Sequence, residues 1–142
     1  ESEMPAVAVT DTGNLFGALE FAADAVKSGV QPIIGCQIRL GLEGQQLVLL
    51  AQTERGYRNL CGLVSESFLK VEPPQTPHIT WEQLESAGEG LLCLTGGIAG
   101  PVAQYLLHNQ SREAEQALRR LMKIFPGRLY IELQRHGLPQ ED

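Results

Sequence analysis

Few residues at the positions where an α/β protein binds ligands could take part in chemistry. In such folds ligands bind at the carboxyl ends of strands. There, Asp11 supplies the single carboxylate and His136 the single imidazole. An aspartate in a turn typically bonds nearby backbone N–H groups, and a loop histidine without a visible partner is usually structural. His78 and His108 are expected in a proline-rich loop and near a helix end, facing solvent. No nucleophile, base and acid can be assembled from these residues.

The three cysteines do not form a recognisable metal or disulfide pattern. Cys36, Cys61 and Cys93 are odd in number, widely separated and free of C-x-x-C pairs. A zinc knuckle or a disulfide framework needs closer or paired spacing. We therefore expect reduced core cysteines in a cytoplasmic protein.

Composition indicates one globular domain that does not hold nucleic acid by charge. The 142 residues are 43% hydrophobic and carry a formal net charge of −6. Nonspecific affinity for a phosphate backbone comes from Lys and Arg, so an acidic surface disfavours it. No apolar run approaches the ~18 residues that span a bilayer. The first five residues do not resemble a signal peptide either.

Hydrophobic patterns alternate between strands and helices along the chain. Asn14, Thr53, Thr80 and Ser111 are expected to cap helices, with Gln83 completing a capping box at Thr80. Pro101 suits the first turn of a helix. The predicted strands are 5–10, 33–38, 46–51, 90–95 and 128–133, and the predicted helices start near 15, 54, 81, 101 and 112. This order favours the α/β class with a largely parallel sheet, either open or barrel-like.

Six segments carry a resemblance to a known family. They are Thr10–Phe21 (TDTGNLFGALEF), Gln31–Gln37 (QPIIGCQ), Leu49–Ala51 (LLA), Gly56–Leu60 (GYRNL), Glu89–Gly100 (EGLLCLTGGIAG) and Tyr130–Pro139 (YIELQRHGLP). In this order and spacing, over nearly the whole chain, they resemble the polymerase-and-histidinol-phosphatase (PHP) domain of bacterial DNA polymerase III alpha subunits. The resemblance implies a distorted (β/α)7 barrel with mostly parallel strands. Residues 1–142 would be one incomplete PHP domain that lacks its N-terminal and C-terminal parts.

The chain departs from this family where a metal site is expected. Members that keep the site have His at the position of Thr12, Glu at that of Gln37, His at that of Gln46 and Cys at that of Gly97. Asp11 and His136 remain as the other two positions of this vestigial site. A catalytic metal needs roughly three to six converging anionic or imidazole ligands. We therefore expect no metal, cofactor or catalytic residue in this segment.

The resemblance also implies a role in the parent protein, a DNA-directed DNA polymerase of chromosomal replication. Its catalysis, with Mg²⁺, would lie in a separate polymerase domain that also makes most DNA contacts. This segment would be a structural and interaction module that packs against the other polymerase domains. In the family, such a domain can also bind the proofreading exonuclease subunit. No membrane partner is expected. Because a severed barrel exposes sheet edges, we also expect the isolated segment to self-associate.

Two alternatives belong to other functional classes. The first is an active metal-dependent PHP phosphoesterase or exonuclease, which would have to tolerate the four replacements. The second is a small phosphate-binding α/β module that uses the turn at Thr95–Gly100 before a helix, where backbone N–H groups favour anions. Its glycines match neither G-x-G-x-x-G nor a P-loop, and close packing of the chain explains them equally well.

Overall fold

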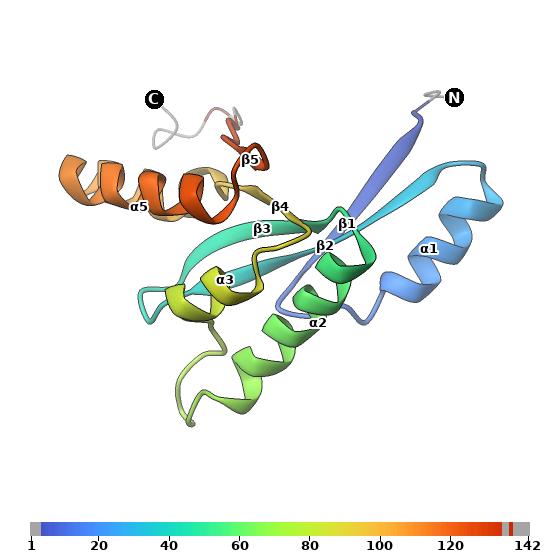
Figure 1. Ribbon diagram of the computed structural model, residues 1–142, viewed down its shortest axis with the longest axis horizontal. Helices are drawn as coiled ribbons and strands as arrows, with labels where there is room; N and C mark the ends of the chain where they lie inside the picture. Colours follow the sequence, from blue (N-terminus) through green and yellow to red (C-terminus); the bar gives the residue numbers. More distant parts are fainter. Residues whose placement is uncertain (1–3, 135–136, 138–142) are drawn as a thin grey trace.

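The computed structural model describes residues 4–134 and 137. They form one five-stranded sheet in the order β1-β2-β3-β4-β5, with helices along it (Figure 1). The strands are β1 (Ala6–Thr12), β2 (Gln31–Leu40), β3 (Gln45–Ala51), β4 (Leu91–Leu94) and β5 (Leu129–Tyr130). The helices are α1 (Ala18–Lys27), α2 (Glu54–Leu69), α3 (Trp81–Ala87), α4 (Pro101–Leu107) and α5 (Ser111–Ile124), with a 3-10 turn, η1 (Gly97–Ala99), before α4.

The sheet confirms the predicted α/β class. β1 and β2 are parallel, as are β4 and β5, whereas β3 runs antiparallel to both of its neighbours. Four of the five described strands therefore point the same way, as in a partial PHP barrel. The sheet is open, with β1 and β5 at its edges. Self-association through these edges stays a prediction.

The core lies between one face of the sheet and the helices. Alternate residues of β2, β3 and β4 point to this helix-covered face, because successive side chains of a strand point to opposite sides. They pack against α2, α3 and α5 in one buried cluster. Its members are Cys36, Ile38, Leu40, Leu47, Leu49, Leu60, Leu63, Ile79, Leu84, Leu91, Cys93, Leu121 and Phe125. The opposite face of the sheet, called here the inner face, is only partly buried.

Local signals predicted several helix starts correctly. The Thr53 side chain accepts a hydrogen bond from the Gly56 N–H at 3.1 Å. Thr80 and Gln83 form the predicted capping box. Pro101 is in the first turn of α4. These interactions stay within a few residues of the chain, so sequence alone suffices to predict them.

Several predictions about element ends were wrong, and Asp11 lies in β1 rather than in a turn. Asn14 does not cap α1, whose cap residue is Gly17. Its carboxamide instead accepts from the Phe16 N–H at 3.1 Å and closes a turn, a competing local bond typical of Asn. Ser111 lies inside α5 and makes no side-chain cap. The last strand ends at Tyr130 rather than residue 133, because the Glu132 N–H bonds the Thr95 hydroxyl at 3.0 Å instead of a strand.

Within residues 4–134, every helix is too short or too polar to cross a lipid bilayer. The cysteines are free, with Cys36 and Cys93 buried and Cys61 partly exposed. The expectation of buried thiols is therefore confirmed for two of the three.

Candidate functional site

The parallel strands β1 and β2 bring together two of the positions at which the resemblance implied lost metal ligands. Thr12 and Gln37 are partners in the β1–β2 register and so share the inner face. The Thr12 hydroxyl donates a hydrogen bond to the Gln37 amide oxygen at 3.0 Å. Both side chains are neutral, and the oxygen of Gln37 that could best bind a cation already accepts this bond. The two side chains therefore hydrogen-bond to each other without a bound ion.

Asp11 lies on the other side of the sheet from that pair. Its register partner is Cys36, whose side chain is buried on the helix-covered face. The Asp11 carboxylate lies close to Gly17, where an added Cβ would be 3.2 Å from its Oδ2. Strand alternation therefore separates Asp11 from Thr12, although the two are adjacent in sequence. Burial raises the pKa of the Cys36 thiol, which suits a core residue rather than a metal ligand.

Gln46 and Gly97 lie further along the sheet. Gln46 is opposite Arg39 in the antiparallel β2–β3 pair, which places both on the inner face with Gln37. Gly97 opens η1 after β4, and a Cβ there would lie 3.1 Å from the side-chain amide of Gln134. His136 lies outside the described residues.

The sequence analysis missed one carboxylate next to this cluster. Glu132 follows β5, and its Oε1 accepts a hydrogen bond from the Gln134 amide that faces Gly97. The predicted strand at residues 128–133 could have pointed to it, because Glu132 alternates there with the apolar residues Ile131 and Leu133. The other carboxylate oxygen, Oε2, is buried and has no hydrogen-bond partner among residues 4–134 and 137.

The glycine turn between β4 and α4 is explained by close packing of the chain. A Cβ on Gly96 would overlap the backbone carbonyl of Gln46, and a Cβ on Gly100 would overlap that of Thr95. Gly96 also has φ of +78°, a conformation that side chains rarely adopt. Pro101, the first residue of α4, has no N–H to offer an anion. The hypothesis of a phosphate-binding module at this turn therefore gains no support from the structure.

The donor set does not fit a catalytic metal. Among residues 4–134 and 137, no three His, Cys, Asp or Glu side chains converge as metal ligands would. Thr12 meets Gln37, and Gly97 meets Gln134, so these contacts offer neutral hydroxyl and amide groups, with the Glu132 carboxylate beside Gln134. A water made nucleophilic by a bound metal requires a charged ligand set that these residues lack.

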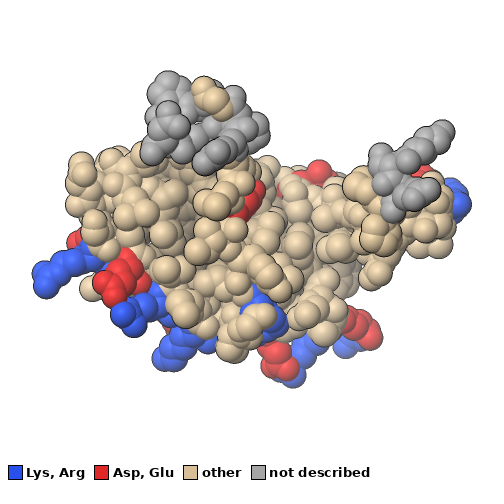
Figure 2. All heavy atoms as spheres, turned by 90° about the horizontal axis from the view of Figure 1, so that it is seen from above, with Lys and Arg blue, Asp and Glu red and all other residues tan. Residues whose placement is uncertain are grey.

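The charges visible on the surface do not form a basic patch. In the view of Figure 2, Lys and Arg side chains lie interspersed with Asp and Glu along one rim, and most of the face is uncharged. Exposed pairs of opposite charge occur within α2 and α5, such as Arg58 with Glu54 and Arg119 with Glu115. This face has no stripe of cations that could follow a phosphate backbone.

Comparison with known proteins identifies the family. The PHP domain family matches residues 1–136. The DNA polymerase III subunit alpha of Caulobacter vibrioides is 42% identical over 99% of this chain and 13% of that protein. The subunits named alike from Rickettsia bellii and Thermus aquaticus are 40% and 38% identical, each over 98% of this chain and 12% of its own length. The chain thus spans about an eighth of these relatives, and it belongs to the PHP domain family.

Proposed function

We propose that this chain is part of the PHP domain of a DNA polymerase III alpha subunit, a cytoplasmic DNA-directed DNA polymerase of chromosomal replication. The three relatives named above, which match almost the whole chain, carry that subunit name. Nucleotide addition, with its Mg²⁺, is assigned to the part of the polypeptide outside residues 1–142.

Within that protein, the segment acts as a structural and interaction module with a degenerate metal site. One observation carries this proposal: two positions that the family uses for ligands, Thr12 and Gln37, hydrogen-bond each other as neutral groups. Restoring a charged ligand at one of them would leave Gln46 and Gly97 unable to coordinate. The other polymerase domains are the expected partners, and the proofreading exonuclease subunit is a further one.

Hydrolysis assays test the degenerate site. The chain should not hydrolyse p-nitrophenyl phosphate or a single-stranded oligonucleotide above the buffer blank, with or without Mn²⁺. Thr12→His alone should not change this, because one imidazole does not complete a ligand set. Thr76→His, in an exposed loop outside the six site positions, is the matched control for an added histidine.

The active phosphoesterase is the competing function. Mn²⁺-dependent turnover by the unaltered chain, abolished by a chelator, would establish it and overturn the proposal. Turnover in Thr12→His but not in Thr76→His would show that the remaining ligands are present and that their positions in the sequence were misassigned.

A further inference from the structure

The first strand and the first helix lie outside the hydrophobic core. Every member of the core cluster comes from the chain after residue 30. Among residues 4–29, Leu15 alone packs against the cluster, and it is itself only partly buried. Figure 1 shows β1 and α1 at the opposite end of the sheet from α5. This end of the molecule therefore contributes little to the core.

Helix α1 is attached to the sheet by small side chains. Its buried residues are Ala18 and Ala25, whereas Leu19 and Val26 are 84% and 65% exposed. The stabilising effect of burial grows with the apolar area that is removed from water. Two alanine methyl groups therefore hold α1 only weakly against the sheet.

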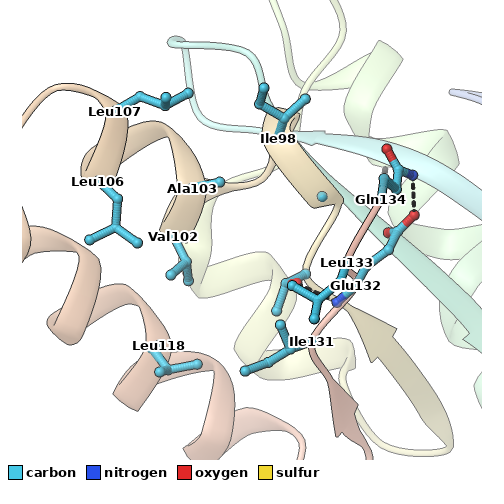
Figure 3. Close-up of a pocket in the computed structure, with 12 residues that line it drawn as sticks. Ile98, Val102, Ala103, Leu106, Leu107, Leu118, Ile131, Glu132, Leu133 and Gln134 are labelled. Carbon is cyan, nitrogen blue, oxygen red and sulfur yellow. Dashed lines mark hydrogen bonds between the residues drawn. The ribbon is translucent and has the colours of Figure 1, made fainter. Parts of the chain in front are cut away.

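The opposite end of the sheet is held by larger side chains. Leu121 of α5 is fully buried, and Leu129 of β5 packs against the core cluster. Val102 of α4, Leu118 of α5 and Ile131 after β5 line a common groove of about 420 Å³ (Figure 3). The elements at this end therefore share one core with β2, β3 and β4.

The junction between β1 and β2 consists mainly of hydrogen bonds. β1 pairs with β2 and with no other described strand. Beyond the ladder, the Gly13 N–H donates to the Gln37 carbonyl at 2.8 Å, and the Thr12 hydroxyl donates to the Gln37 amide oxygen at 3.0 Å. Hydrogen bonds of an exposed sheet edge with few buried contacts open at a lower free energy than those of a core.

We infer that β1 and α1, residues 6–27, open from β2 as one unit while the remainder of the described chain stays folded. The hinge is the connection at residues 28–30. Its Gly29 has φ of +72°, and an added Cβ there would have no atom within 4 Å, so no other element holds this turn at that point. Opening separates Thr12 from Gln37 and thereby takes the degenerate site apart. It also uncovers the edge of β2, so the unit governs access to that edge.

Native-state hydrogen exchange of the 142-residue chain, followed by NMR in low concentrations of urea, tests this inference. The amides of Val9 and Ala25 report on the unit, and those of Val48 and Leu49, in a strand paired on both sides, report on the core. Relative to intrinsic rates, the amides of the unit should exchange at least roughly a hundredfold faster. Their rates should also depend less on urea, because partial opening exposes less surface than global unfolding. Equal protection with equal urea dependence would overturn the inference.

Two matched alanine variants distinguish partial opening from global unfolding. Ala25 in α1 and Ala117 in α5 are 8% and 6% exposed, and glycine at either position weakens its helix. Ala117→Gly should accelerate exchange of Leu49 about fivefold and leave Val9 unchanged, because α5 stays folded when the unit opens. Ala25→Gly should accelerate both, since α1 unfolds in both events. Equal acceleration of Val9 and Leu49 in Ala117→Gly would show that the chain opens only as a whole. The exchange of the unaltered chain decides the question even if a variant does not fold.

Discussion

Two glycines of α2 should respond in opposite directions to the same substitution. Gly56 is buried, and a Cβ on it would overlap the backbone carbonyl of Gly90. That carbonyl also accepts the N–H groups of Gln52 at 2.9 Å and Thr53 at 3.3 Å. Gly62, six residues along the same helix, is exposed and has no atom within 4 Å of an added Cβ.

The structure determines the size of both effects. Gly62→Ala should raise the free energy of unfolding by about 0.5–1 kcal/mol, the helix propensity difference. Gly56→Ala gains at most the same amount. The added methyl group must push α2 away from Gly90, and this overpacking costs about 1–3 kcal/mol. The shift also weakens the hydrogen bonds at the Thr53 cap and at the Gly90 carbonyl, at about 1 kcal/mol for each bond. A net loss of about 2–4 kcal/mol follows.

Urea unfolding at 25 °C, followed by circular dichroism, measures both substitutions. The midpoint should fall for Gly56→Ala and rise for Gly62→Ala, with an unchanged slope if both proteins remain two-state. A Gly56→Ala protein as stable as the unaltered chain would refute the reasoning, since α2 would then have room beside Gly90. It would also remove the packing explanation for the glycine of the GYRNL segment.

Two further predictions concern side chains. Arg120→Met should lower the free energy of unfolding by about 1 kcal/mol, because its guanidinium lies 4.8 Å from the Trp81 ring and pairs with carboxylates of α3. Arg119→Met, which breaks only an exposed pair within α5, should change it little, and equal effects in urea unfolding would contradict this. Burial raises the pKa of the Cys93 thiol to about 12, so at pH 8 a maleimide should label Cys61, the partly exposed thiol, first. Mass spectrometry that finds Cys93 labelled first would contradict it.

The sequence determined those features that depend on near neighbours. Thr53, Thr80 with Gln83, and Pro101 begin helices through bonds or ring geometry confined to one turn, so their spacing was enough to predict them. The α/β class followed from the alternation of apolar patterns. The family could be predicted from motifs spread over nearly the whole chain, because each motif is a short stretch of sequence. The failures at Asn14 and Ser111 show the limit of such signals, because a turn or a neighbouring residue can take the same role.

The tertiary structure decided which distant residues meet. The bond between Thr12 and Gln37 depends on the register of two parallel strands joined by α1, and register sets which side chains share a face. The same alternation keeps Asp11 away from the site, whereas hydrogen bonds with Thr95 and Gln134 hold Glu132 beside it. Gly56 needs no side chain because Gly90, distant in sequence, occupies the space. These contacts close long loops, and no local pattern encodes which segments a long loop will bring together.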